Sequence, residues 1–252
     1  MAEPETDGAS PATAAILVIG DEILSGRTQD TNTHYIANYL SQIGVDLREA
    51  RVVPDVEAEI VAALNALRAR YTYVFTTGGI GPTHDDITAD AVAKAFGVGI
   101  GEDPRAIAML RERFTEAELN PARRRMARIP EGAELLRNGA SKAPGFWIGN
   151  VIVMAGVPVI MQSMMDTAGP MLRAGARVQV ETVDAGPIPE GSYAIALEEI
   201  ARAHPSVSIG SYPHFSAAGV RNQIVLRGRD AEALVIAARK VRDLLSSLAA
   251  NP

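Results

Sequence analysis

Glycines and acidic residues gather in one stretch of the chain, residues 74–88, which read VFTTGGIGPTHDDIT. Gly78, Gly79 and Gly81 directly follow an apolar run and carry no side chain, so a ligand could approach the main chain closely there. A helix is expected to begin just after them, and the N–H groups at a helix start attract phosphate. The stretch therefore predicts a phosphate-binding loop.

Neither common nucleotide fingerprint explains this loop. Pro82, Thr83 and His84 stand where a dinucleotide-binding motif would have its third glycine, and no Gly-Lys-Ser/Thr occurs in the chain. We therefore expect phosphate to be held by the loop itself, through Gly78, Gly79, Ile80, Gly81, Pro82 and Thr83.

The acidic pair Asp85-Asp86 ends the same loop. Two neighbouring carboxylates would repel a phosphate unless a cation lay between them. Mg²⁺ prefers oxygen ligands and often shares them with substrate phosphates, so the pair predicts a divalent metal on Asp85 and Asp86. The alternative, that one aspartate caps the helix and the other is solvated, stays open at this point. His84 fits a surface or capping position better than a ligand.

The elements that must position these residues follow a regular pattern. Short apolar runs rich in β-branched residues alternate with segments of helical period, which is typical of a parallel sheet covered by helices. The expected strands are 14–19, 45–53, 71–76, 146–148 and 151–154. The expected helices begin near 30–32, at 55 and at 87, with two more over 104–129 and another over 158–173.

The pattern changes after Gly175. Strands over 178–183, 209–212 and 223–226 with helices over 192–204 and 231–248 predict a small sheet covered on one face, and 184–191 is expected to be a loop within it. We expect a disordered lead over 1–12, a main domain over 13–174 and a small α+β extension over 175–252. The Met-rich helix and this extension suggest self-association as a dimer or trimer.

Further carboxylates follow the first two expected strands, at Asp21-Glu22 and at Asp55. In this fold class ligands lie beyond the carboxyl ends of the strands. If the third strand neighbours both of the others, Asp21, Asp55 and Asp86 converge on one crevice. Asn32 adds a polar group at the same rim. Taken singly, each acidic residue fits a turn or a cap as well.

Composition narrows the class of protein. The 252 residues include 24 Lys and Arg against 30 Asp and Glu, a net charge of −6, so there is no general reason to bind nucleic acid. The absence of cysteine excludes disulfide scaffolds, zinc ribbons, iron–sulfur clusters and a thiol nucleophile, and the missing G-x-S-x-G elbow disfavours a serine hydrolase. No run approaches the roughly 18 apolar residues of a membrane span. With no signal peptide pattern, we expect a cytoplasmic protein.

Five motifs together identify a resemblance: GDEILSGRTQDTN, RVVPD, TTGGIGPTHDDITADAV, APGF and AGVP. The sequence resembles the MoaB/Mog-type molybdopterin-binding domain family over residues 13 to about 172. Within it, the likeness is to the N-terminal part of CinA proteins and to the molybdopterin-binding-like domain of FAD synthase. The remainder looks like the small KH-type extension of the CinA group.

The resemblance implies a three-layer α/β/α core with a mostly parallel sheet. It implies that Asp55 and Asp86 match two aspartates that serve adenylyl transfer in the Mog branch, and that the GGIGPT turn holds pterin or nucleotide phosphates. The AGVP motif adds Gly156 to the expected binding residues, beside Asp21, Glu22 and Asn32. Relatives are described as metal-dependent hydrolases of ADP-ribose or of FAD, both dinucleotide pyrophosphates.

The sequence departs from the family pattern in two respects, and both limit which properties of the family we expect of it. Ala155 stands where the family often has proline, so the rigidity of that loop is not carried over. The sequence ends at Pro252, so we do not expect the amidohydrolase activity of full-length CinA or the adenylyltransferase activity of FAD synthase.

Three functions follow, in order of preference. The first is metal-dependent hydrolysis of a nucleotide pyrophosphate such as ADP-ribose or FAD, with Mg²⁺ or Co²⁺, and with K⁺ as a further candidate cation. The second is a molybdopterin carrier or molybdopterin adenylyltransferase, with molybdopterin as ligand. The third is a module that only binds nucleotide or mediates assembly. A small nucleotide or pterin is the expected partner in all three.

Overall fold

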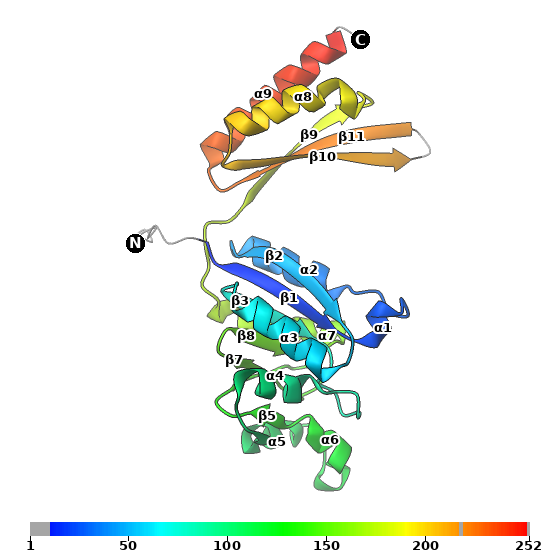
Figure 1. Cartoon of the computed structure of the whole chain (residues 1–252), viewed down its shortest axis with the longest axis vertical. Coiled ribbons are helices and arrows are strands. Elements are labelled where there is room, and N and C mark those ends of the chain that lie inside the picture. Colours follow the sequence, from blue (N-terminus) through cyan, green and yellow to red (C-terminus); the bar gives the residue numbers. More distant parts are fainter. Residues whose placement is uncertain (1–10, 217–218, 251–252) are drawn as a thin grey trace. The chain divides into compact units, whose positions relative to one another are not determined.

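The computed structural model describes residues 11–216 and 219–250, and these form two units that divide between Gly175 and Ala176. Figure 1 shows the elements of both units. The lead expected over residues 1–12 lies, as far as residue 10, outside the described residues. Each unit is described by itself below.

The larger unit is built on a six-stranded sheet in the order β2-β1-β3-β8-β7-β6. The strands β1, β2, β3 and β8 run parallel, and β7 is antiparallel to both of its neighbours. Their bounds are β1 Thr13–Ile19, β2 Asp46–Val53, β3 Tyr73–Thr77, β6 Glu134–Leu136, β7 Gly145–Ile148 and β8 Val151–Met154. The mostly parallel α/β sheet predicted from the sequence is confirmed.

Helices cover both faces of this sheet, which is why its inner strands β1 and β8 are almost entirely apolar and buried. Along β1, Ala15, Leu17 and Ile19 belong to one core, and the alternate residues belong to the other. The helices α3 (Glu57–Arg68) and α4 (Thr88–Phe96) pack on the first face, and α2 (Asn32–Gln42) and α7 (Pro158–Ala168) on the second. The result is the three-layer core that the resemblance implies.

The segment 100–130 departs from the two helices that were expected over 104–129. Its first part forms α5 (Pro104–Leu110), and a short 3-10 turn precedes α6 (Pro121–Arg125). After α6 the chain turns into a strand, β5 (Arg128–Pro130), which pairs with β4 (Ile100–Glu102). The helix prediction was wrong beyond Arg125 because Ile129 and Ala127 enter the core from this strand and the turn before it, and Pro130 has no N–H for a helix.

The Met-rich helix α7 also ends earlier than expected. It stops at Ala168, and Pro170 opens a short 3-10 turn in place of the last helical turn predicted to Arg173. Met161, Met164 and Met165 are almost fully buried and fill the second core. Because these methionines are buried, they offer no surface for self-association, and the expected dimer or trimer stays a prediction.

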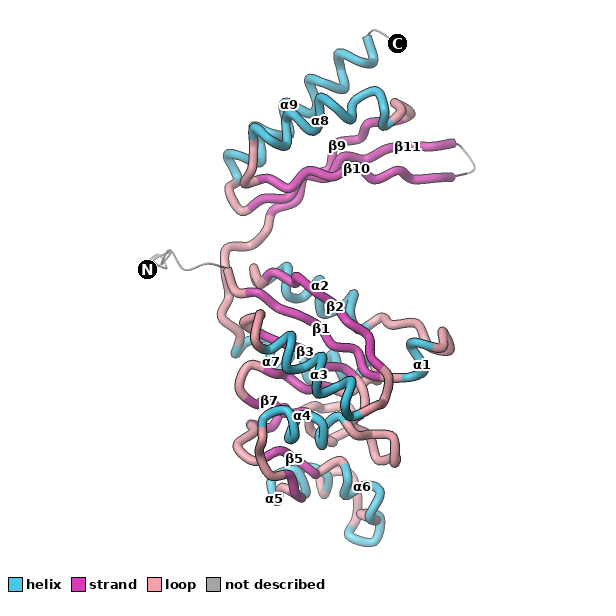
Figure 2. The backbone as a smooth tube through the Cα atoms, in the orientation of Figure 1, coloured by secondary structure: helices cyan, strands magenta, loops and turns pink. Residues whose placement is uncertain are grey.

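The smaller unit is a three-stranded antiparallel sheet with two helices, as Figure 2 shows. Its elements are β9 Gln179–Gly186, α8 Glu190–Ala203, β10 Val207–Ser216, β11 Gly219–Gly228 and α9 Ala231–Ala250. Both helices contribute to one apolar core with the sheet, so the predicted one-sided cover is confirmed. The loop predicted over 184–191 was too long, because β9 continues to Gly186.

Within the described ranges no helix, including the 20-residue α9, is both long and apolar enough to cross a membrane.

Asn150, in the turn between β7 and β8, contacts both the end of α3 and β3. Its side chain donates from Nδ2 to the carbonyl oxygens of Arg68 and Tyr71, both at 2.9 Å, and its main-chain carbonyl accepts from Val74 N–H at 2.8 Å. In the structure it fixes where β3 enters the sheet.

We expect Asn150→Ala to lower the free energy of unfolding of the larger unit by about 1–3 kcal/mol, because two carbonyl groups lose their donor. Urea unfolding followed by the fluorescence of Trp147 measures this, since Trp147 is the only tryptophan of the chain and lies in β7. The matched control is Asn65→Ala on the exposed side of α3, for which we expect a change within about 0.5 kcal/mol. Equal urea midpoints for the two variants would contradict the role of Asn150.

Candidate functional site

The candidate site lies where the four parallel strands end. After β1 the short helix α1 (Asp21–Leu24) begins with Asp21-Glu22, and the loops after β2, β3 and β8 carry Asp55, the glycine loop 78–86 and Gly156. The expected arrangement had the third strand between the other two, but β1 is the strand that neighbours both β2 and β3. Asp21 and Asp55 still meet, because the carboxyl ends of adjacent parallel strands share one edge, whereas Asp86 does not join them.

Asp55 is at the centre of a cluster of carboxylates. Its Oδ2 accepts the main-chain N–H of Asp21 at 2.9 Å. Burial raises the pKa of Asp55, the bond from Asp21 N–H offsets part of that rise, and the charges of Asp21, Glu22 and Asp85 raise the pKa further. In the described part of the chain no Lys or Arg lies within 4.0 Å of Asp21, Glu22 or Asp55, so their negative charges have no close partner.

Asp86 points into its own loop. Its Oδ1 accepts Gly81 N–H at 2.7 Å, and its Oδ2 accepts the N–H and the hydroxyl of Thr83 at 2.8 and 2.5 Å. Asp85, not Asp86, is the residue of the pair whose charge acts on Asp55. The structure therefore gives Asp86 a clear role in holding the loop, which is close to the capping alternative left open by the sequence.

The glycines at the start of the loop are required by the packing of the loop itself. Gly78 and Gly79 have φ angles of 103° and 66°, which residues with a side chain rarely adopt. A Cβ added at Gly78 would lie 2.1 Å from the carbonyl oxygen of Ile19. One added at Gly79 would lie 2.2 Å from the hydroxyl oxygen of Thr88. Thr88, which the sequence did not single out, donates from Oγ1 to Gly78 O at 3.0 Å and from N to Gly79 O at 3.0 Å.

A cavity of about 560 Å³ lies beside this loop. Apolar side chains form much of its wall, from Phe114, Met126, Ile160 and Met164, and Arg113 adds a cation. The loop contributes main chain, since neither Gly79 N–H nor Ile80 N–H has a hydrogen-bond partner among the described residues. A flat ring could lie against the apolar wall while an anion meets the N–H groups and Arg113.

The structure brings most of the predicted site residues to this cavity. Those that line it are Glu22, Gly78, Gly79, Ile80, Gly81, Pro82, Asp86 and Gly156. Thr83 lies in the loop and donates hydrogen bonds to Asp86. Asn32 lines a smaller chamber next to the cavity. Asp21, Asp55 and Asp85 do not line the cavity, but Asp55 is near enough to feel the charge of Glu22, which does.

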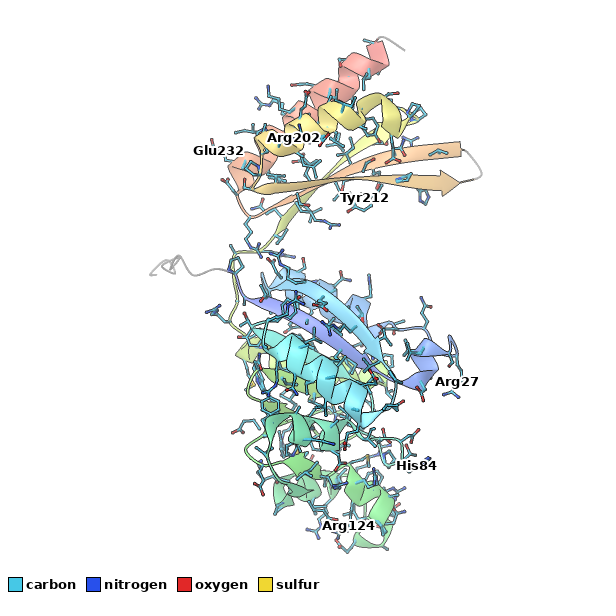
Figure 3. The ribbon with its side chains drawn as sticks, in the orientation of Figure 1. Arg27, His84, Arg124, Arg202, Tyr212 and Glu232 are labelled. Carbon is cyan, nitrogen blue, oxygen red and sulfur yellow. The ribbon has the colours of Figure 1, made fainter. Side chains whose placement is uncertain are left out.

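His84 and the arginines of α6 and β5 lie apart from the cavity. The His84 side chain is 99% exposed and projects into solvent (Figure 3), as its surface assignment predicted. In the cluster of arginines on α6 and β5, Arg124 pairs with Glu102 and Glu116, and Arg128 pairs with Asp90. Arg125 donates from Nη2 to the main-chain oxygen of Asp86 at 3.2 Å and so helps to hold the end of the loop.

The wall residues Arg113, Phe114 and Met126 were missed by sequence reasoning. They come from the segment between β4 and β5, which read as two plain helices, and no motif marks them. The nearest signal was the helix break at Asn120-Pro121, which shows that this segment is irregular but not what it covers.

The acidic cluster has the oxygen donors that a divalent cation such as Mg²⁺ prefers. Asp55, Asp21, Glu22 and Asp85 offer carboxylates without a competing Lys or Arg, and the charges of the other three add to the rise that burial causes in the pKa of Asp55. Among residues 11–216 and 219–250, however, no three His, Asp or Glu side chains are arranged as a ready ion site. A cation here would need further ligands from a substrate or from water.

Comparison with known proteins agrees with this architecture. Residues 15–174 match the family model described as "Probable molybdopterin binding domain", and residues 185–251 match the model described as "FAD synthase, middle domain". A protein of Aeropyrum pernix is 34% identical over 233 residues, which is 87% of each chain. A CinA-like protein of Gemmatimonas aurantiaca is 34% identical over 90% of this chain and 57% of its own length.

A solved structure supports the same relationship. The crystal structure of the protein CinA from Thermoplasma acidophilum, a protein of unknown function, superposes with a TM-score of 0.61. It is 34% identical, and the match covers 64% of this chain and 98% of that one. Since the family model alone covers more than half of the chain, the protein belongs to the molybdopterin-binding domain family of the MoaB/Mog type, with CinA-like proteins among its relatives.

Proposed function

We propose that this site hydrolyses the pyrophosphate bond of a nucleotide such as ADP-ribose or FAD, with a divalent cation. One observation carries the proposal: carboxylates without cationic partners gather beside a cavity that offers an apolar wall, free main-chain N–H groups and Arg113. Mg²⁺ or Co²⁺, when bound, would neutralise phosphate oxygens and lower the pKa of a coordinated water. Without cationic charge, these carboxylates would repel the substrate.

In this proposal the chain's own residues divide the work. The apolar wall around Phe114 and Met126 takes the base, while Arg113 and the N–H groups of Gly79 and Ile80 hold phosphate oxygens. Asp55 accepts a proton from the attacking water. Its Oδ2 is occupied by Asp21 N–H, so Oδ1 is the atom available. The water oxygen bonds to phosphorus, the bridging P–O bond breaks, and its electrons leave with the departing phosphate.

The family matches support the same substrate class. The smaller unit matches the model described as the middle domain of FAD synthase, and FAD is a dinucleotide pyrophosphate. CinA-like relatives cover both units of this chain, so the two units occur together elsewhere.

We expect Asp55→Asn to reduce AMP release from ADP-ribose by a factor of about 10² to 10⁴, because the asparagine amide cannot accept the proton. Turnover with Mg²⁺ or Co²⁺, followed by chromatography of the products, measures this. The control is Glu59→Gln on the exposed side of α3, which should keep wild-type turnover. Equal turnover of Asp55→Asn and wild type would remove Asp55 from the mechanism.

The pH dependence follows from the raised pKa of Asp55. A raised pKa means that the carboxyl is protonated at a higher pH than an ordinary aspartate, so kcat/KM should fall as the pH drops through that pKa. Asp21→Asn removes one negative neighbour but keeps the main-chain donor, so we expect the acidic limb of the profile to move to lower pH. An unchanged or opposite shift in a pH series of kcat/KM would show that another group controls this limb.

We expect Asp86→Asn to abolish AMP release through loss of binding. An asparagine amide keeps only one acceptor oxygen, so its NH2 group must face either Gly81 N–H or the donors of Thr83, and the loop cannot keep its shape. Calorimetric titration with ADP-ribose should show at least about tenfold weaker binding for Asp86→Asn, whereas Asp55→Asn still binds. The control is Asp166→Asn, an exposed position on α7. Undiminished binding by Asp86→Asn would contradict its role in holding the loop.

A second candidate is a molybdopterin-binding or molybdopterin-adenylylating protein. The description of the matched family model favours it, and the apolar wall suits a pterin ring as well as an adenine. Mass spectrometry of the purified protein for bound pterin, with product analysis after addition of ATP and molybdopterin, separates it from the hydrolase. Tight ADP-ribose binding without turnover across several metals would instead favour a module that only binds.

A further inference from the structure

A small chamber of about 50 Å³ adjoins the main cavity on the side of α2. The two share Glu22, Thr28, Gly156 and Pro158 in their walls, so one ligand can reach both. The chamber continues between the end of β1, the end of β3 and the start of α2, where Asn32 and Thr77 line it. Its volume admits the edge of a ligand but not a ring.

Two buried polar atoms in this wall have no partner among the described residues. They are Oδ1 of Asn32, a residue 7% exposed, and Oγ1 of Thr77, a residue 1% exposed. The orientation of the Asn32 amide is fixed by Gly156, whose carbonyl oxygen can only accept, and does so from Nδ2 at 2.7 Å. The Asn32 oxygen is therefore the free end. Buried polar groups in proteins are almost always hydrogen-bonded, so these two atoms indicate a missing partner.

The charges of the wall show what kind of partner fits. Asp30 already accepts the N–H groups of Asn32 and Thr33 at 2.9 and 3.1 Å, so the start of α2 does not attract an anion. Glu22 brings a second carboxylate. With Asn32 Oδ1 and these carboxylates as acceptors, the chamber favours neutral groups that donate hydrogen bonds and disfavours phosphate.

We propose that this chamber receives the 2′- and 3′-hydroxyl groups of a nucleotide ribose. Neighbouring hydroxyls present two donors on one edge, and a carboxylate that accepts from ribose hydroxyls is a common solution in nucleotide sites. The Thr77 hydroxyl can donate to one of them while Asn32 Oδ1 accepts from it or from the other. This inference rests on the proposed function, and it specifies a substrate whose ribose carries both hydroxyls.

Calorimetric titration of the protein with two ADP analogues tests the inference. One is α,β-methylene-ADP, which cannot be hydrolysed at its bridging carbon, and the other is its 2′,3′-dideoxy counterpart. We expect wild type to prefer the dihydroxy analogue by about tenfold or more, since each lost hydrogen bond lowers affinity by up to roughly that factor. Thr77→Val, which keeps the shape of the side chain, should reduce this preference without weakening the dideoxy analogue.

The matched control is Thr76→Val. Thr76 is also fully buried with an unpartnered hydroxyl, but it does not line the chamber, because neighbouring residues of a strand face opposite sides of the sheet. It should keep the wild-type preference. Equal binding of both analogues by wild type, an unchanged preference in Thr77→Val or an equal loss in Thr76→Val would overturn this inference alone. Binding of neither analogue would overturn the proposed nucleotide function as well.

Discussion

The carboxylate of Asp86 is the contact on which the shape of the site depends. It accepts three hydrogen bonds from Gly81 and Thr83 and so closes the loop that follows β3. The N–H groups of Gly79 and Ile80, two residues that line the cavity, have no partner among the described residues. Arg125 and Thr88 support the loop from the protein side. One side chain thus satisfies the rest of the turn and leaves two main-chain N–H groups unbonded within the described part of the chain, and the proposed phosphate contact depends on these two groups.

The carboxylates next to this loop work against stability. Because the pKa of Asp55 is higher in the folded protein than in the unfolded chain, its ionisation disfavours folding above that pKa and has no effect below the unfolded value. A fold keeps such an arrangement only where the rest of the structure outweighs it. The sheet does so here, because both of its faces are covered by buried apolar cores. Uncompensated charge of this kind is a recognised mark of functional sites.

The sequence predicted the layered fold and the edge of the sheet where the site lies. Continuous apolar runs such as Ala14–Ile19 could only be strands buried on both sides, and the loops after them had to share one edge. It could not predict which carboxylate of Asp85-Asp86 turns inward, because that depends on hydrogen bonds to Gly81 and Thr83 that form only when the loop closes. The sequence also could not predict that Arg113 and Phe114 line the cavity, since tertiary contacts bring their segment there and no motif marks it.

The origin of that wall has an evolutionary consequence. The acidic groups and the glycine loop lie at strand ends, whereas Phe114, Met126 and Arg113 come from the excursion between β4 and β5. Under the proposed function, the reacting groups and this part of the ligand-contacting wall therefore lie in separate stretches of the sequence. Drift or insertion within residues 103–127 can reshape what enters the pocket while the reactive edge stays intact, so descendants of one ancestor can diverge in preferred ligand without rebuilding the sheet.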